Sequence, residues 1–125
     1  MAGKISTHVL DLSCGRPAAG IEVALYRIGE AEARTLLGCS VTNSDGRTGR
    51  PLLEGADLKA GEYELVFFVA DYFQGTAGEA GARMAGGGVP FLNRVPIRFC
   101  VGDEGRSYHV PLLVSPGGYS TYRGS

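Results

Sequence analysis

The sequence predicts an all-β domain folded as a β-sandwich of seven or eight strands. Two observations support this fold class. Short segments of alternating apolar and polar residues recur along the chain, and clusters of turn-forming residues rich in glycine separate them. Strands at this spacing are typical of two packed sheets. The 125 residues suffice for one such domain, residues 1–125, which can bury roughly two thirds of its unfolded surface.

The expected strands are short and regularly spaced. The clearest alternation is at residues 95–101, where every second residue is apolar. Pro96 in this segment has no N–H to donate, which predicts an edge position or the start of a strand. The second half of residues 63–70 is apolar on both faces, as in a strand covered on both sides. In chain order, we expect strands at residues 5–12, 21–28, 35–42, 63–70, 95–101, 107–114 and 118–122.

One stretch differs from this pattern. Residues 71–85 can form one short helix, and the three consecutive glycines at 86–88 cannot belong to a regular element. We therefore expect one short helix and a flexible insertion at residues 76–90.

Composition narrows the possible functions. A chain with 44% hydrophobic and 20% charged residues is globular rather than disordered. Its net charge of -1, without any run of basic residues, argues against nucleic acid or a membrane surface as a partner. Residues 1–12 lack the apolar stretch of a signal peptide, and no segment reaches the roughly 20 apolar residues of a spanning helix. We therefore expect a cytoplasmic protein.

The cysteines suggest neither disulfide bonds nor a zinc site. There are three, an odd number, and their spacing matches neither kind of motif. The sequence therefore predicts free thiols, buried or half-buried, at Cys14, Cys39 and Cys100.

The two histidines are candidates for proton transfer. His8 and His109 both fall within predicted strands. A single histidine in a strand is usually a half-buried, hydrogen-bonded side chain, but an imidazole can also accept and donate protons near neutral pH. Two histidines do not complete a zinc site without a carboxylate or a thiolate nearby, so we predict no metal.

Two further features have polar side chains that could bind a substrate. Arg47 follows Asp45 and Gly46 in a predicted turn, where an arginine is either an exposed loop cation or a rigid fork that binds a carbonyl or carboxylate oxygen. The last four residues, 122–125, combine a phenol, a guanidinium, a hydroxyl and the terminal carboxylate. Taken alone, such a tail is more often frayed than functional.

Several motifs together agree with one known family. They are Ser6–Asp11, Gly15–Ala18, Thr42–Arg47, Gly61–Leu65, Asp71–Phe73 and Tyr108–Ser125. With them the chain resembles the 5-hydroxyisourate hydrolases, the transthyretin-related enzymes of purine catabolism. The resemblance covers essentially the whole chain. It departs at residues 76–90, which are longer and richer in glycine than the linker that the family usually has.

The resemblance implies a fold, an assembly and a reaction. The fold is a transthyretin-like sandwich of two sheets with about eight strands and one short helix. The assembly is a homotetramer, a dimer of dimers, with active sites in the channel between the dimers. The reaction is hydrolysis of the N1–C6 bond of 5-hydroxyisourate, which gives 2-oxo-4-hydroxy-4-carboxy-5-ureidoimidazoline without a metal or another cofactor.

The same resemblance implies roles for individual residues. The implied catalytic residues are His8, Arg47, His109 and Ser125. The residues implied to contact substrate are His8, Arg47, Tyr122, Arg123 and Gly124. Which histidine is the general base and which the general acid stays open.

Two other functions are compatible with a β-sandwich of this kind. A transthyretin-type protein could bind a thyroid-hormone-like ligand in the same channel without catalysis, but such a ligand favours aliphatic and small lining residues over histidine and arginine. A non-catalytic adhesion or regulatory domain would not be expected to end on its most reactive residues.

Overall fold

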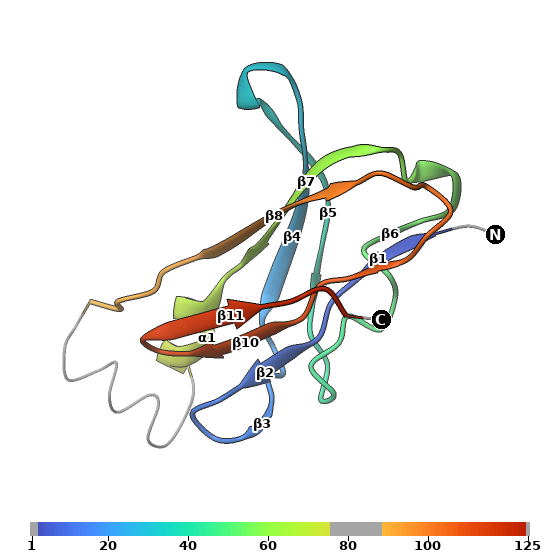
Figure 1. The fold of residues 1–125 in the computed structure, drawn as a ribbon. Helices are drawn as coiled ribbons and strands as arrows, with labels where there is room; N and C mark the ends of the chain where they lie inside the picture. The colour runs from blue at the N-terminus through green and yellow to red at the C-terminus, as the bar shows by residue number, and fades with distance from the viewer. Residues whose placement is uncertain (1–2, 76–88, 125) are drawn as a thin grey trace.

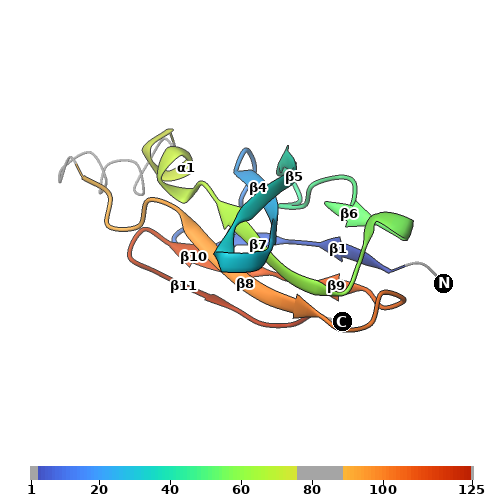
Figure 2. The same ribbon diagram turned by 90° about the horizontal axis from the view of Figure 1, so that it is seen from above.

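A computed structural model of the chain describes residues 3–75 and 89–124 as a sandwich of two layers. One layer is the sheet β5-β4-β7-β8, and the other is made of two smaller sheets, β11-β10-β2-β3 and β6-β1-β9 (Figures 1 and 2). The strands are β1 (Lys4–Ser6), β2 (Val9–Asp11), β3 (Arg16–Pro17), β4 (Glu22–Ile28), β5 (Arg34–Val41), β6 (Leu53–Glu54), β7 (Gly61–Phe67), β8 (Val95–Val101), β9 (Tyr108–His109), β10 (Leu112–Ser115) and β11 (Gly118–Thr121). The predicted all-β sandwich with one short helix is confirmed.

Two of the expected strands are each interrupted in the middle. Residues 5–12 divide into β1 and β2, and residues 107–114 divide into β9 and β10. Pro111 lies at the second break and has no N–H for a ladder, while Thr7 at the first break donates its hydroxyl to the Val110 carbonyl at 2.6 Å. β1 runs parallel to β9, and β2 runs parallel to β10. The two interrupted segments therefore lie side by side, and each passes from the sheet β6-β1-β9 to the sheet β11-β10-β2-β3 at its break.

These breaks correct one prediction. His8 does not lie inside a strand but between β1 and β2, whereas His109 lies in β9 as expected. The backbone at His8 is nevertheless fixed, because its carbonyl accepts a hydrogen bond from the Leu112 N–H at 2.9 Å.

The helix begins earlier than its sequence suggests. α1 spans Val69–Gly75, and β7 ends at Phe67 instead of continuing to residue 70. Val69, Ala70 and Phe73 are buried in the core, so the apolar run that predicted a longer strand instead supplies the inner face of the helix. The predicted insertion at residues 76–90 lies largely outside the described residues.

α1 is attached to the strand that follows His8. The Tyr72 hydroxyl donates to the buried Asp11 carboxylate at 2.7 Å, and the Ser13 N–H donates to the same carboxylate at 2.8 Å. Burial acts to raise the pKa of Asp11, but the hydrogen bonds from Ser13 and Tyr72 outweigh it and keep the pKa below its ordinary value. Asp11 is therefore an ionised anchor at the end of β2.

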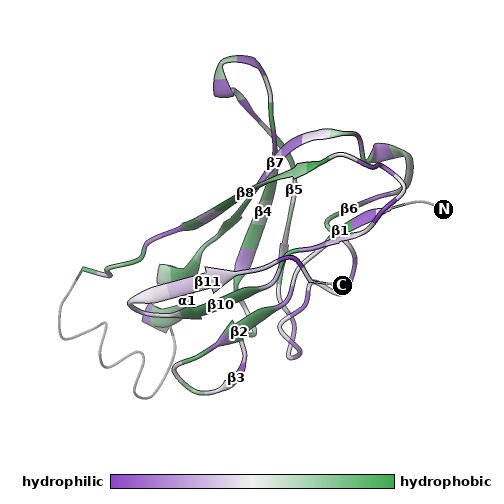
Figure 3. Cartoon of the chain, viewed as in Figure 1, coloured by the Kyte–Doolittle hydropathy of each residue, from purple (hydrophilic) through white to green (hydrophobic). Residues whose placement is uncertain are grey.

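The apolar core lies between the two layers. Apolar residues are concentrated in β4, β10 and α1, whereas β11 is more polar (Figure 3). In β8, Val95, Ile97 and Val101 are buried while Pro96 is exposed, so the predicted alternation is confirmed. β8 also stands at the end of its sheet, as Pro96 predicted.

The cysteines only partly match expectation. Cys14, Cys39 and Cys100 are free thiols, as predicted, but all three are exposed, so the prediction of burial was wrong. Cys100 shares the outer face of β8 with Arg98, and Cys14 lies in the turn after β2. In the described part of the chain, no helix has the length and apolarity needed to cross a membrane.

Candidate active site

Most of the residues singled out from the sequence lie around one depression. It has a volume of about 460 Å³. Its lining comes from β1, the junction after β1, the loop after β5, the end of β9 with the residue before that strand, and the C-terminal tail. The lining residues are Lys4, Ser6, His8, Arg47, Ser107, His109, Tyr122 and Gly124. Five of the seven predicted site residues are thus brought together.

His109 is held on several sides. Its backbone carbonyl accepts the Gly124 N–H at 2.8 Å, which joins the tail to β9. Its Nδ1 lies 2.9 Å from the Ser6 hydroxyl oxygen. A Cβ added to Gly124 would lie 2.5 Å from His109 Cδ2, so the tail passes directly against this edge of the ring. The imidazole is half-buried and has little freedom to turn.

The surroundings of His109 favour its neutral form. Burial lowers the pKa of His109, and the positive charges of Arg47, His8 and Lys4 lower it further. A neutral imidazole near neutral pH keeps a lone pair that can accept a proton. The site therefore offers a base at this position.

His8 is positioned by the turn that also carries Arg47. Gly46 has a φ of +76°, and a Cβ added there would lie 3.2 Å from His8 Cδ2 and too close to the Val9 carbonyl oxygen. The Gly46 carbonyl accepts the Val9 N–H at 2.8 Å. Glycine is required here both for its backbone conformation and because the His8 ring is so close.

The Arg47 backbone is set by Asn43. The Asn43 side-chain oxygen accepts the N–H of Asp45 at 2.9 Å and that of Arg47 at 3.3 Å, and the Asn43 N–H donates to the Arg47 carbonyl at 2.7 Å. The Arg47 side chain is exposed and has no ion-pair partner among the described residues. Its guanidinium is therefore available to an anionic group.

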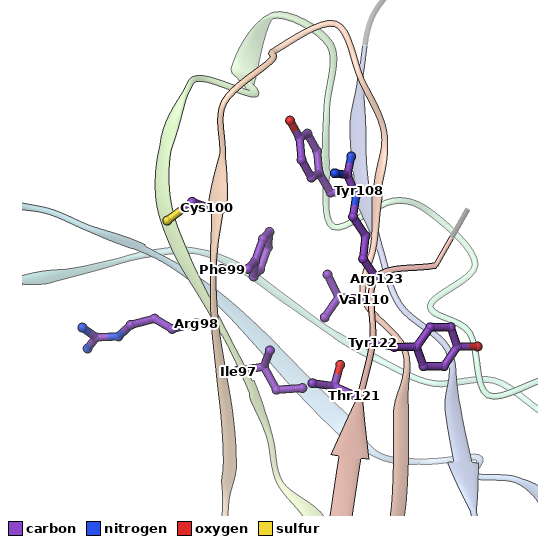
Figure 4. Close-up of a pocket in the computed structure, with 9 residues that line it drawn as sticks. All are labelled: Ile97, Arg98, Phe99, Cys100, Tyr108, Val110, Thr121, Tyr122 and Arg123. Atoms are coloured by element: carbon purple, nitrogen blue, oxygen red, sulfur yellow. The ribbon is translucent and has the colours of Figure 1, made fainter.

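The tail borders two depressions: Tyr122 lines both, Gly124 lines the one with the histidines, and Arg123 lines the other. Arg123 does not line the depression of the histidines; its guanidinium lies 4.6 Å from the centre of the Tyr108 ring. It borders a second depression of about 240 Å³ between β8 and the tail. Figure 4 shows Arg123 extending beside Tyr108, while the Tyr122 ring points away from the apolar side chains of β8. Ser125 lies outside the described residues.

Sequence reasoning missed three lining residues. Lys4 and Ser107 belong to no motif, Ser6 begins the Ser6–Asp11 motif without an assigned role, and only the fold brings the three to the depression. The alternation of an unbroken strand places Ser6 on the same face as His8. Pairing of β1 with β9 also places Ser6 beside His109, and the sequence pattern does not show that contact.

The described lining residues carry charge of only one sign. Lys4 and Arg47 are cationic, and none of the described lining residues is a carboxylate. Among the described residues, no three side chains of His, Cys, Asp or Glu are grouped so that they could hold a metal ion. The arrangement can bind an electron-rich or anionic molecule between two imidazoles and a guanidinium.

The fold and the site together define a transthyretin-like sandwich with an imidazole-guanidinium centre at a surface depression. The profile of the HIUase/Transthyretin family matches residues 5–124, and the chain belongs to this family.

Relatives and solved structures match over the full chain. The chain is 52% identical to the 5-hydroxyisourate hydrolase of Halalkalibacterium halodurans, with 100% of both chains covered. The structure of Klebsiella pneumoniae 5-hydroxyisourate hydrolase matches with a TM-score of 0.71 and 38% identity, over 98% of this chain and 99% of that one. The crystal structure of (S)-allantoin synthase matches with a TM-score of 0.83 and 42% identity, over 99% of this chain but only 44% of that chain.

Proposed function

We propose that the protein is a hydrolase that opens 5-hydroxyisourate at its N1–C6 bond and forms 2-oxo-4-hydroxy-4-carboxy-5-ureidoimidazoline. The observation that carries this proposal is the convergence of His8, Arg47 and His109 on one depression. The 52% identity to a 5-hydroxyisourate hydrolase over the whole chain supports it.

The reaction needs two proton transfers and the stabilisation of one negative charge. A water molecule must lose a proton, the oxyanion that forms at C6 must be stabilised, and N1 must gain a proton as it leaves. The new C–O bond forms from the water oxygen to C6, and the electron pair of the C6–N1 bond goes to N1. The product is a carboxylic acid, which then ionises.

The environment of each side chain suggests how these roles are divided. His109 is the general base, because burial and the charges around it lower its pKa and leave a proton-accepting lone pair. Arg47 has no ion-pair partner among the described residues, and its guanidinium stabilises the oxyanion. His8, on the same depression, delivers the proton to N1.

The remaining residues bind and orient the substrate. Tyr122 supplies a flat apolar face and a hydroxyl for the bicyclic ring. Gly124 brings the tail against the His109 ring, and a role for Ser125 in catalysis stays a prediction from the sequence. Arg123 fixes the tail by stacking on Tyr108, and any direct contact of its guanidinium with substrate stays a prediction from the sequence.

The functional unit in this proposal is a homotetramer, a dimer of dimers. Two observations support association. β8 and β11 each stand at the end of their sheet, and unpaired edges favour pairing with another chain. Leu12, Tyr119 and Tyr122 are exposed although they are large and apolar or aromatic. Contact between subunits would turn an open depression into an enclosed site. The cytoplasmic location remains a prediction of the sequence.

A single assay tests the proposed reaction. Freshly generated 5-hydroxyisourate is followed by its ultraviolet absorbance with and without the protein. We expect the absorbance to decay much faster with catalytic amounts of protein, because a positioned base and an oxyanion partner together lower the barrier. Decay at the spontaneous rate, with stoichiometric binding of an apolar hormone-like ligand, would instead support the transthyretin-type binding protein.

A further inference from the structure

We infer that Ser6 is a positioning residue: its hydroxyl oxygen accepts the Nδ1–H of His109 and so turns the lone pair on Nε2 toward the substrate. This inference rests on the proposed function. Ser6 begins the Ser6–Asp11 motif, but the sequence assigns it no role, and its role follows from the packing of two strands.

The backbone fixes where the Ser6 hydroxyl can be. Ser6 is the last residue of β1 and is paired in parallel with His109 in β9. Its carbonyl accepts the Val110 N–H at 2.9 Å, so the register of the two strands cannot slip at this point. Side chains at paired positions point to the same side of a sheet. The Ser6 oxygen accordingly lies 2.9 Å from Nδ1 of His109.

The other edges of the ring identify the free nitrogen. Gly124 lies against Cδ2, and Ser6 occupies Nδ1. Nε2 has no hydrogen-bond partner among the described residues, and His109 lines the depression. Nε2 is therefore the ring nitrogen available to a water molecule or to substrate.

The charged neighbours determine which nitrogen carries the hydrogen. A neutral imidazole has one N–H and one lone pair. Lys4 from β1, His8 from the junction and Arg47 from the loop are the basic groups around the depression, and the Arg123 guanidinium lies over the adjacent Tyr108. A field of positive charges favours a lone pair, not an N–H, facing the depression. The hydrogen then sits on Nδ1, and Ser6 is its acceptor.

This arrangement gives the serine a function that is separate from stability. With the hydroxyl present, the neutral ring has its lone pair on the nitrogen that faces the depression. Without it, the Nδ1–H loses its partner, the alternative tautomer becomes competitive, and the ring can turn. Fewer molecules then hold a competent base at any moment, although substrate binding is nearly unchanged.

Kinetics of three variants test this role. For Ser6→Ala we expect kcat to fall about tenfold with KM changed by less than about twofold, the scale of one hydrogen bond. Ser6→Thr keeps the hydroxyl on a strand-compatible side chain and should restore kcat to within about twofold of the unmodified protein. Ser40→Ala is the matched control, since Ser40 is also a partly buried strand serine but does not line the depression.

The pH dependence gives a second readout. An acceptor at Nδ1 stabilises the imidazolium more than the neutral ring, so losing it lowers the pKa of His109. The acid limb of kcat should therefore move to lower pH in Ser6→Ala and stay in place in Ser6→Thr. Unchanged kcat and an unchanged acid limb in Ser6→Ala would refute the inference.

A spectroscopic measurement separates this inference from the proposed function. The chain has two histidines, so long-range ¹H–¹⁵N correlation of histidine-labelled protein resolves both rings, and His8→Asn assigns them. We expect the Nδ1–H form of His109 to dominate at neutral pH and to give way to a mixture in Ser6→Ala. A dominant Nε2–H form in the unmodified protein would overturn the inference even if 5-hydroxyisourate is hydrolysed. The expected form in a protein that leaves 5-hydroxyisourate untouched would instead refute only the proposed function.

Discussion

Replacing His109 with asparagine is expected to lower kcat for 5-hydroxyisourate by about 10²-fold or more, the scale of losing a general base. Asparagine keeps a polar group that can still hydrogen-bond to Ser6, and the Gly124 N–H bonds to the backbone carbonyl of residue 109, which the substitution retains. The fold and the docking of the tail should therefore survive. The decay of absorbance under saturating substrate measures the effect.

Folding must be checked separately from activity. The circular dichroism spectrum of His109→Asn should match that of the unmodified protein. Its free energy of unfolding should differ by no more than about 0.5 kcal/mol, the usual effect of a partly exposed polar substitution. Turnover near that of the unmodified protein in a correctly folded His109→Asn variant would remove His109 from the mechanism.

Replacing Arg47 with alanine is expected to lower kcat by about 10² to 10³-fold, the range found when an oxyanion partner is removed. Arg47→Lys should recover part of the loss, because a lysine keeps the charge but not the two-pronged geometry. Arg16→Ala is the control, since Arg16 is an exposed arginine in β3 that does not line the depression.

The comparison of kcat and KM shows which state Arg47 stabilises. A guanidinium that acts on the developing oxyanion changes kcat more than KM, whereas one that only attracts an anionic substrate changes KM. An Arg47→Ala variant with altered KM and unaltered kcat would assign Arg47 to substrate binding alone.

Much of the fold could be predicted because local patterns agree with it. The period of two in residues 95–101 gave β8 with its correct bounds, and Pro96 gave its place at the sheet edge. The breaks after Ser6 and His109 could not be predicted in the same way, because hydrophobic alternation continues through them. They depend on Pro111 and on a hydrogen bond between Thr7 and Val110, which lie far apart in the sequence.

The start of α1 was missed for a related reason. An apolar run such as residues 65–70 fits a buried strand and the buried first turn of a helix equally well. Only the burial of Phe73 together with Val69 distinguishes the two, and that depends on what packs against them.

The residues of the candidate site likewise include some that the sequence could predict and some that it could not. His8, Arg47 and His109 could be selected from the sequence because their side chains can transfer protons or bind an oxyanion and because each matches a site residue of the family, and all three lie at one depression. Ser6 and Lys4 could not, because their relevance comes from strand pairing and from electrostatic contact with His109. Arg123 lies at the second depression, because its guanidinium stacks on Tyr108.

The proposed mechanism depends most on a neutral His109 that acts as the base in 5-hydroxyisourate hydrolysis. The pH dependence of kcat/KM tests it directly, because a base must be unprotonated and burial together with Arg47, His8 and Lys4 lowers its pKa below the ordinary 6.5. We predict that the acid limb of kcat/KM has its midpoint below pH 6.5, and that this midpoint moves to higher pH in Lys4→Ala, which removes one of the positive charges. A kcat/KM that rises as the pH falls through this range, or a midpoint at or above 6.5, would contradict the account.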